Sequence, residues 1–322
     1  MQAYYVTEKG GEIKKGEQPI PEPAKDEIRI KIKAIGLNPF DHKIVNVGPP
    51  KWKYPHILGL DVAGVVDAVG SLVTKFAIGD EVCGLCDFTR NGSFAEYVVV
   101  KTHCFQKKPS EIDWGYAISL VTGGMTAYRN VVEDMQIEEG KTILVQGGAG
   151  GVGSYAIQFA KNCGLKVFTT CSPNSNEFVK KLGADVCIDY HDVDVAKKCL
   201  ELTEGKGVDY VFECVSLNLV PNDLLCVGKE GVVMTIVGIP EGTESPSENI
   251  KLTRSSLIKG HMFDIEEECI NVGKSMQSVI DLAIEKKIQT TVTKTMPFDE
   301  LLEGIELIKT GHSKGKVVIT HN

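Results

Sequence analysis

The run "GGAGGVG", Gly147–Gly153, places five glycines in seven residues. It follows "TILVQ", an apolar segment typical of a buried strand, and precedes "SYAIQFAKN", which has the composition of a helix. A flexible joint between two lobes would need neither flank, whereas a strand-to-helix turn uses such glycines to bring backbone close to a pyrophosphate. The phosphates then meet free N–H groups at the helix N-terminus. The run therefore predicts a dinucleotide-binding turn.

The glycines of this turn have different expected roles. Gly148 permits the tight turn, Gly150 lets backbone approach the pyrophosphate, and Gly153 lets the helix pack closely on the strand. A turn that is rich in glycine for packing alone is the alternative. The predicted cofactor contacts in the turn are Gly148, Ala149, Gly150, Gly151, Val152 and Gly153.

Apolar strands alternate with longer helical segments on both sides of this turn. Five such strands separated by helices predict right-handed βαβ units and a parallel, doubly wound sheet. The segment 240–249, "PEGTESPSEN", has the composition of a solvated loop. The expected strands are 141–146, 166–171, 185–190, 209–215 and 231–238, and the expected helices are 153–161, 177–182, 195–202 and 220–227.

The chain before Gly115 has a different pattern, in which short β-like runs alternate with turns. "IRIKIKAI", residues 28–35, alternates apolar and basic residues, as a strand with one buried face does. Since 322 residues are too many for one ordinary core, we expect two domains in an α/β chain. A helix behind Pro297 and a strand at 316–320 could extend the parallel sheet or return to the first domain.

Composition excludes several classes of protein. The formal net charge of −8 argues against general nucleic-acid binding, because such binding needs a basic protein surface. No uninterrupted apolar run is long enough to span a membrane, and the first residues lack the form of a secretion signal. We therefore expect a cytoplasmic protein of ordinary composition, with 43% hydrophobic and 24% charged residues.

The ten cysteines are scattered and often lie inside apolar runs, so we expect them to be reduced and mostly buried. Cys83 and Cys86 form a Cys-x-x-Cys pair, but this pair follows "GDEV" and is predicted to lie in a strand. A redox pair would need a helix N-terminus to lower the thiol pKa. The sequence leaves a redox role for this pair open.

The end of the second predicted strand of the parallel sheet bears on the choice of cofactor. NAD sites usually have an acidic residue there, which binds the ribose 2′-hydroxyl. This chain has "CSPNSN" instead, and a missing carboxylate favours NADPH, although no Arg or Lys occurs before Lys180. The predicted contacts in this segment are Ser172, Asn174 and Asn176.

A set of motifs is spread over the chain: "GLNPFDHKI", "GLDVAGVV", "FAEYVVV", "VTGGMTAY", "GGAGGVG", "KLGADVCIDY" and "GHSKGKVVI". In their order and spacing they resemble the zinc-independent quinone oxidoreductases, including the plant-type alkenal/enone reductases, of the medium-chain dehydrogenase/reductase superfamily. The resemblance implies a GroES-like β domain from residues 1–122 and 264–322, and a Rossmann NADPH-binding domain from 123–263. It further implies a homodimer and an active site in the cleft between the domains.

The resemblance also allows a test for a catalytic metal. Zinc-dependent relatives hold the metal with a Cys, a His-Glu pair and a further Cys or acid, where this chain has Asn38 and Gly59-Leu60-Asp61. Their structural zinc needs four closely spaced cysteines, of which only Cys83 and Cys86 are present. We therefore expect no zinc. Without a Lewis acid, hydride transfer needs an acceptor that is already conjugated, namely a quinone or an α,β-unsaturated carbonyl.

The catalytic candidates come from "NPFDHK". Asn38 could hold the nicotinamide ribose or a substrate oxygen, and Lys43 could stabilise developing negative charge. Each has a structural alternative: Asn38 in a turn before Pro39, Asp41 as a helix cap, and Lys43 in solvent. Because the neighbouring positions lack the tyrosine of some relatives, His42, solvent or a cofactor hydroxyl remain open as proton donor. The candidate catalytic residues are Asn38, Asp41 and Lys43.

The resemblance assigns further cofactor contacts, mostly at the ends of strands, where ligands of parallel sheets bind. They are Thr126, Tyr190, Gly238, Ile239 and Lys316, the last with a solvated strand-edge lysine as its alternative. The predicted function is NADPH-dependent, zinc-independent reduction of a quinone or enone. An enoyl-thioester reductase and a non-catalytic NADPH-binding sensor or structural protein are the alternatives.

Overall fold

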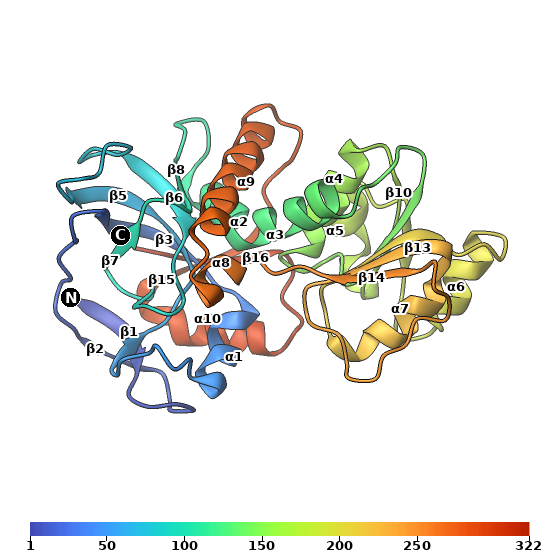
Figure 1. Cartoon of the computed structure of the whole chain (residues 1–322), viewed down its shortest axis with the longest axis horizontal. Helices are drawn as coiled ribbons and strands as arrows, with labels where there is room; N and C mark the ends of the chain where they lie inside the picture. The colour runs from blue at the N-terminus through green and yellow to red at the C-terminus, as the bar shows by residue number, and fades with distance from the viewer. Residues whose placement is uncertain (322) are drawn as a thin grey trace. The chain divides into compact units, whose positions relative to one another are not determined.

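The structure, a computed structural model, describes residues 1–321 and contains two compact units (Figure 1). The first unit comprises Met1–Met125, Leu257–Lys286 and Thr290–Asn322, and the second comprises Thr126–Ser256 and Lys287–Gln289. Contacts thus assign residues 257–263 to the first unit. The domain boundaries drawn from the sequence at 122/123 and 263/264 stay a prediction.

Two sheets form the first unit. The three-stranded sheet has the order β2-β1-β4, and the seven-stranded sheet has the order β15-β16-β3-β5-β6-β8, with β7 also paired to β3. Because β16 pairs antiparallel with β3, the C-terminal strand returns to this unit, which settles the question that the sequence left open. The strands are β1 (Gln2–Val6), β2 (Lys14–Glu17), β3 (Glu27–Gly36), β4 (His56–Ile57), β5 (Asp61–Val69), β6 (Glu81–Leu85), β7 (Tyr97–Lys101), β8 (Phe105–Lys107), β15 (Val292–Pro297) and β16 (Lys316–Thr320).

The alternation predicted for residues 28–35 is confirmed in β3, where Ile28, Ile30 and Ile32 are buried while Lys31 is exposed. The helices of this unit are α1 (Pro39–Val47), α2 (Trp114–Ser119), the π-helical segment Leu120–Gly124, α8 (Lys259–Phe263), α9 (Glu266–Ile284), the 3-10 segment Phe298–Glu300 and α10 (Leu301–Lys309). The sequence analysis did not predict α9, although its buried residues recur at helical spacing from Cys269 to Ala283.

The second unit is built on a six-stranded parallel sheet with the order β11-β10-β9-β12-β13-β14. The five predicted strands are confirmed, whereas the sixth, β14, follows the loop 240–249 and was not expected. The strands are β9 (Thr142–Val145), β10 (Lys166–Thr170), β11 (Val186–Ile188), β12 (Val208–Glu213), β13 (Val227–Thr235) and β14 (Lys251–Arg254).

The predicted helices between these strands are also confirmed, within one or two residues at their ends. They are α4 (Gly153–Asn162), α5 (Asn176–Lys181), α6 (Val195–Leu202) and α7 (Val220–Cys226), with 3-10 segments at Pro173–Ser175 and Leu217–Leu219. The short α3 (Met125–Tyr128) and the π-helical segment Arg129–Asp134 precede the sheet.

The core of the second unit lies where helices cover the sheet. Leu144, Phe168, Val211 and Val233, from four adjacent strands, have no exposed surface. Strands covered on both faces need such continuous apolar runs, and this is the pattern that made them recognisable in the sequence.

Two further sequence expectations concern the whole described chain. Among residues 1–321, no helix combines the length and the apolar character that crossing a membrane requires.

All ten cysteines are free, and seven of them are buried, as expected. Cys83 lies within β6 and Cys86 directly follows it, so this pair does not stand at a helix N-terminus. Burial raises the pKa of Cys83 to about 12, which argues against a reactive thiolate there.

Candidate functional site

The glycine-rich turn lies at the carboxyl end of β9, the strand from which the chain winds outward in both directions. Strands β10 and β11 lie on one side of β9 and strands β12 to β14 on the other, so the turn sits at the topological switch point of the sheet. This is where open parallel sheets bind their ligands. Residues 147–153 therefore occupy the expected position for a dinucleotide.

The glycines of the turn differ in what they allow. Gly147 has φ +65°, so the left-handed conformation falls there and not at Gly148, to which the sequence analysis assigned the tight turn. Gly148 is needed because a larger residue would collide with Thr169: a Cβ at this position would lie only 2.0 Å from Thr169 Oγ1. The close packing expected of Gly153 is confirmed, because a Cβ there would lie 2.3 Å from the Gly147 carbonyl oxygen.

Gly150 is the one glycine of the motif GxGxxG with open space beside it. A Cβ at Gly150 would meet only the Gly147 carbonyl oxygen, at 3.4 Å. The loop itself does not require glycine at this position, so an approaching ligand is the remaining reason for it. Ala149, Gly151 and Val152 are half-buried beside it.

Buried side chains that were not predicted from the sequence fix the glycine-rich turn through a series of hydrogen bonds. Thr170 Oγ1 accepts from the Gly147 N–H at 2.9 Å and donates to Gln146 Oε1 at 2.7 Å. Gln146 Nε2 in turn donates to Asp223 Oδ1 at 2.7 Å. Burial and the neighbouring Glu213 raise the pKa of Asp223 to about 8, so its carboxyl is more readily protonated at neutral pH than that of an exposed aspartate.

The remaining cofactor candidates of the second unit lie mostly beyond the carboxyl ends of neighbouring strands. Ser172 follows β10 and lies 3.3 Å from Ser175 through their hydroxyls, and Tyr190 follows β11 and is 47% exposed. Gly238 follows β13 with φ +112° and open space around it. Asn174 lies in the 3-10 segment after β10 and Asn176 begins α5, whereas the exposed Ile239 follows Gly238 and Thr126 lies buried in α3.

The first unit brings two candidates, Asn38 and Lys316, together with Asp61 in a buried polar network. Lys316 Nζ donates to Asn38 Oδ1 at 2.6 Å and to Asp61 Oδ2 at 2.7 Å. The Lys316 and Asp61 side chains are only 3% and 0% exposed. The solvated strand-edge alternative for Lys316 is therefore wrong, whereas its contact with the cofactor stays a prediction.

The sheet register explains this network. Gly36 of β3 pairs with Asp61 of β5 on one side and with Val318 of β16 on the other, so both charged residues start their strands next to Gly36. A Cβ on Gly36 would lie 2.7 Å from both Asp61 Oδ2 and Lys316 Cε. Glycine is thus what allows the ion pair to cross the sheet here.

The network fixes the orientation of the Asn38 amide. Its oxygen accepts from Lys316 and its nitrogen donates to the Gly36 carbonyl at 3.1 Å, which leaves one amide hydrogen for another acceptor. Thr122 Oγ1 donates to Asp61 Oδ1 from the π-helical segment. Nothing in the sequence spacing could have placed Thr122 or Lys316 beside Asn38, because they meet only through the sheet.

Asp41 is a buried cap of α1, as one alternative from the sequence proposed. Its Oδ2 accepts from the Asn38 N–H at 2.7 Å, and its Oδ1 is buried without a partner. Burial, followed by the charge of Asp61, raises the pKa of Asp41 to about 8, against the lowering effects of the Asn38 N–H and Lys316. Asp41 is therefore largely protonated at neutral pH.

The two residues after Asp41, His42 and Lys43, are less buried than Asp41. Lys43 is exposed on α1, as its solvated alternative proposed. Burial lowers the pKa of His42, with Lys43 and Lys309 acting in the same direction, so its imidazole is neutral at pH 7. A neutral imidazole is a poor proton donor, which disfavours His42 in that role.

The network does not fit a catalytic zinc. An amide and a carboxylate stand where zinc-dependent relatives have their ligands, and the Lys316 ammonium already pairs with that carboxylate. Within residues 1–321, the one cluster of three or more Cys, His, Asp or Glu side chains with ligand atoms within 4.8 Å of one another is Cys104, His261 and Cys269. None of these residues belongs to the network.

The chain matches two known protein families and a protein of similar length. The "Alcohol dehydrogenase GroES-like domain" family matches residues 24–110, and the "Zinc-binding dehydrogenase" family matches residues 151–278. A Spinacia oleracea protein named "Quinone-oxidoreductase homolog, chloroplastic" is 31% identical over 320 residues, which cover 95% of this chain and 93% of that protein. The chain belongs to the quinone oxidoreductases of the medium-chain dehydrogenase/reductase superfamily.

Solved structures of this superfamily agree. A quinone oxidoreductase from Pseudomonas syringae matches with a TM-score of 0.89 and 25% identity over 99% of both chains. A mycobacterial protein complexed with NADPH matches with a TM-score of 0.88 and 28% identity, covering 99% of this chain and 100% of that one. The predicted fold class, a GroES-like β domain with a Rossmann domain, is confirmed.

Proposed function

We propose that the protein is an NADPH-dependent reductase of quinones or α,β-unsaturated carbonyls that uses no catalytic metal. The observation that carries this proposal is the buried Lys316–Asp61–Asn38 network, in which Asn38 and Asp61, at the positions that the resemblance assigns to zinc ligands in relatives, both accept hydrogen bonds from the Lys316 ammonium. An uncomplexed carbonyl is a weak hydride acceptor unless conjugation spreads the incoming charge. The absence of fitting metal ligands therefore favours a conjugated substrate.

Asn38 is the residue that we expect to touch the reacting molecule. The hydrogen bond from Lys316 leaves its amide no freedom to rotate, so the remaining N–H points in one direction. Such a fixed donor stabilises negative charge as it develops on a carbonyl oxygen. Lys316 then acts as a positioning residue, since its ammonium is already committed to Asn38 and Asp61.

The loops at the carboxyl ends of the parallel strands would hold NADPH, which supplies the hydride. The open side of Gly150 would receive the pyrophosphate. The loop after β10 would receive the ribose phosphate, because it has no carboxylate before Glu177 to repel it. Tyr190, exposed beyond β11, would contact the adenosine end.

Steady-state assays with a quinone, a short enone and an enoyl-CoA, each with NADPH and with NADH, test the substrate and cofactor together. We expect turnover of the quinone or enone with NADPH, retained after treatment with a zinc chelator. Turnover of the enoyl-CoA alone would identify an enoyl-thioester reductase. NADPH binding without oxidation by any acceptor would identify a non-catalytic binding protein.

A pair of variants tests the cofactor preference. Ser172→Asp places a carboxylate at the end of β10, where it would repel a 2′-phosphate and bind a 2′-hydroxyl. We expect this variant to bind NADPH more weakly and NADH more tightly, while the matched neutral variant Ser172→Asn keeps the preference of the natural protein. NADH that binds the natural protein as tightly as NADPH would contradict the proposal.

A further inference from the structure

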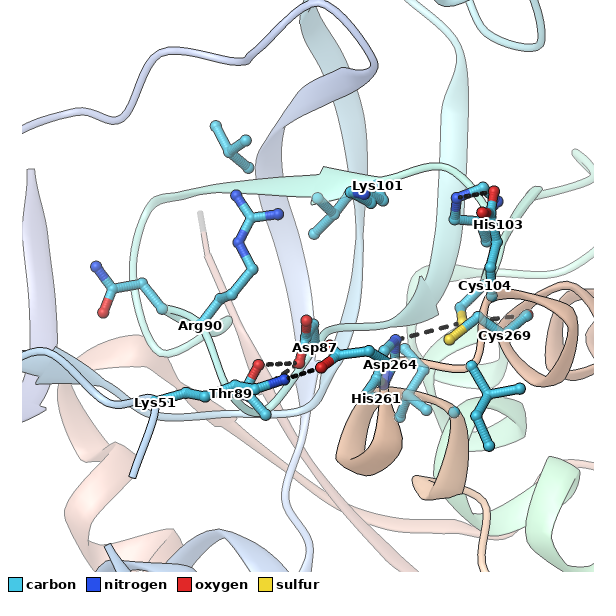
Figure 2. Close-up of a pocket in the computed structure, with 17 residues that line it drawn as sticks. Lys51, Asp87, Thr89, Arg90, Lys101, His103, Cys104, His261, Asp264 and Cys269 are labelled. Carbon is cyan, nitrogen blue, oxygen red and sulfur yellow. Dashed lines mark hydrogen bonds and ion pairs between the residues drawn. The ribbon is translucent and has the colours of Figure 1, made fainter. Parts of the chain in front are cut away.

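A pocket of about 480 Å³ opens in the first unit (Figure 2). Its lining includes Asp87 and His103, and none of the residues of that network lines it. Cys104, His261 and Cys269 form part of its wall. The proposed function gives this pocket no role.

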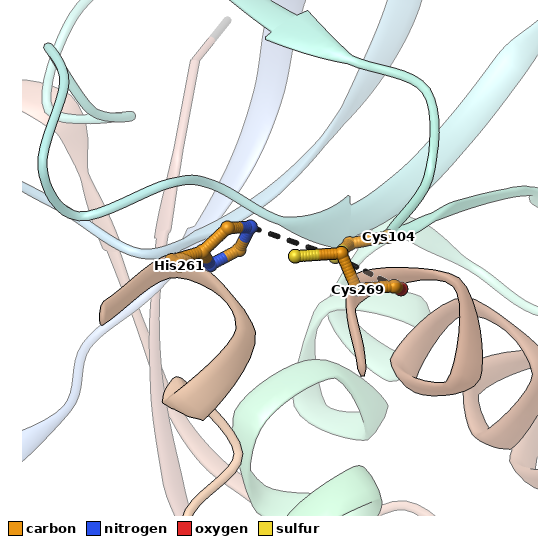
Figure 3. A group of neighbouring side chains, drawn as sticks. All are labelled: Cys104, His261 and Cys269. Carbon is orange, nitrogen blue, oxygen red and sulfur yellow. Dashed lines mark hydrogen bonds between the residues drawn. The ribbon is translucent and has the colours of Figure 1, made fainter. Parts of the chain in front are cut away.

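The three side chains come from separate segments and meet at one point (Figure 3). Cys104 directly precedes β8, His261 lies in α8 and Cys269 lies in α9. Cys104 Sγ is 3.7 Å from His261 Nε2 and 3.3 Å from the Cys269 carbonyl oxygen. One ligand atom from each of the three residues lies within 4.8 Å of the others.

Close helix packing builds this cluster. A Cβ on Gly260, the residue before His261, would lie 2.7 Å from Cys269 Sγ, so glycine lets α8 approach α9. A Cβ on Gly273 would lie 2.0 Å from the His103 carbonyl oxygen, so a second glycine lets α9 approach the segment of Cys104. Gln106 Nε2 also donates to the Gly273 carbonyl at 2.6 Å. These contacts hold the three ligands in place from both sides.

The distance between Cys104 Sγ and His261 Nε2 suits a tetrahedral zinc ion. With Zn–S of about 2.3 Å and Zn–N of about 2.0–2.1 Å, two tetrahedral ligands lie about 3.6 Å apart for S and N and about 3.8 Å for two S atoms. The observed Sγ–Nε2 distance is 3.7 Å.

We propose that Cys104, His261 and Cys269 bind one zinc ion, with the fourth ligand position open to the pocket. Two thiolates and a neutral imidazole would hold the metal, and both thiol protons would leave to solvent on binding. Three protein ligands with an open position is an arrangement that zinc adopts in catalytic sites, whereas purely structural sites are closed. The site is distinct from the catalytic zinc of relatives, whose ligand positions this chain has lost.

Metal analysis of the purified full-length protein tests this proposal directly. We expect about one zinc per chain in protein produced with zinc, and a thiolate-to-cobalt charge-transfer band when Co²⁺ replaces it. Both measurements use the natural protein, so they stand even where a variant folds poorly. Protein without zinc that also shows no such band on titration with Co²⁺ would overturn the proposal.

Variants assign the metal to these residues. Cys269→Ser and His261→Gln should each weaken Co²⁺ binding at least about a hundredfold, since even outer-shell changes cost up to that factor. The matched controls are Cys163→Ser, which alters a half-buried cysteine of the second unit, and His103→Gln, which alters a histidine of the same pocket. Both controls should bind metal as the natural protein does. A band that persists in Cys269→Ser and His261→Gln alike would place the metal elsewhere.

Peptide mass spectrometry separates the metal from a redox role of the same cysteines. A disulfide between Cys104 and Cys269 in freshly purified, metal-free protein would overturn the zinc site and identify an oxidisable pair. Zinc that is lost in Cys269→Ser while quinone or enone reduction continues would leave the proposed metal-free function intact. Failure of either proposal is therefore visible without the other.

Discussion

Removing the Lys316 ammonium is the sharpest perturbation of the buried network. In Lys316→Met, the Asp61 carboxylate would remain fully buried without its cation, and Asn38 Oδ1 would lose its donor. Breaking a buried ion pair on one side costs about 3–5 kcal/mol, because the remaining charge stays desolvated. We expect a loss of that size in the free energy of unfolding at pH 8.

The double variant Asp61→Asn/Lys316→Met separates the ion pair from side-chain packing. It removes both charges, so we expect it to recover most of the loss and to lie within about 2 kcal/mol of the natural protein, as replaced buried pairs often do. Lys43→Met is the matched control, since Lys43 is exposed and should change stability by no more than about 0.5 kcal/mol.

Urea unfolding followed by tryptophan fluorescence is the appropriate assay. The two tryptophans, Trp52 and Trp114, both belong to the first unit, so their emission reports on the unit that contains the network. Trp52 is 7% exposed and its Nε1 donates to the Phe88 carbonyl at 2.8 Å, so unfolding changes its surroundings strongly.

The pH dependence of the single variant provides a second measurement. Without Lys316, a charged Asp61 carboxylate would be buried with no cation beside it, and lowering the pH supplies protons that can neutralise it. The destabilisation by Lys316→Met should therefore shrink as the pH falls from 8 toward 4. The argument is refuted if the single variant loses less than about 1 kcal/mol, or if the double variant is as unstable as the single one.

Other predictions follow from the two sites. Gly153→Ala should cost about 2 kcal/mol of stability, because its Cβ would meet the Gly147 carbonyl oxygen. Gly150→Ala should fold normally yet bind NADPH at least about tenfold more weakly. Equal NADPH binding by Gly150→Ala and the natural protein in calorimetry would refute the role assigned to Gly150. Asp41 has a raised folded-state pKa of about 8, so its contribution to stability is complete below the unfolded value of 3.8 and is lost progressively up to about pH 8, with a slope of at most about 1.4 kcal/mol per pH unit. Asp41→Asn should remove that slope in denaturation curves measured from pH 4 to 9, and an unchanged slope would assign it to another group. Asn38→Ala should lower kcat/KM about a hundredfold with little change in NADPH affinity, while an unchanged kcat/KM would exclude the amide as an oxyanion donor.

Local patterns made most of the fold predictable. The strands of the parallel sheet are continuous apolar runs, and β3 alternates with period two, so a few consecutive residues reveal each of them. The helix α9 and the strand β14 were missed. The pattern of α9 is interrupted by small and polar residues such as Gly273 and Ser275, and β14 is only four residues long after a polar loop.

The cofactor turn could be predicted from neighbouring residues, whereas the surroundings of the catalytic candidates could not. The turn is contiguous, so its strand, glycines and helix can be recognised together, although the left-handed backbone occurs at Gly147 and not at Gly148, which was expected to permit the tight turn. Asn38 was found through a motif, but the partner that orients it is 278 positions away in the chain. No spacing rule connects residues so distant.

The sequence by itself therefore determined what depends on neighbours along the chain: β3, five strands of the parallel sheet, the helices between them and the glycine-rich turn. The tertiary structure alone decided that Lys316 is buried against Asp61, because strand register brings both beside Gly36. It alone also brought Cys104, His261 and Cys269 together, since close packing at Gly260 and Gly273 joins segments that lie far apart in sequence. Charges and metal ligands act over a few ångströms in space, and only the folded chain sets those distances.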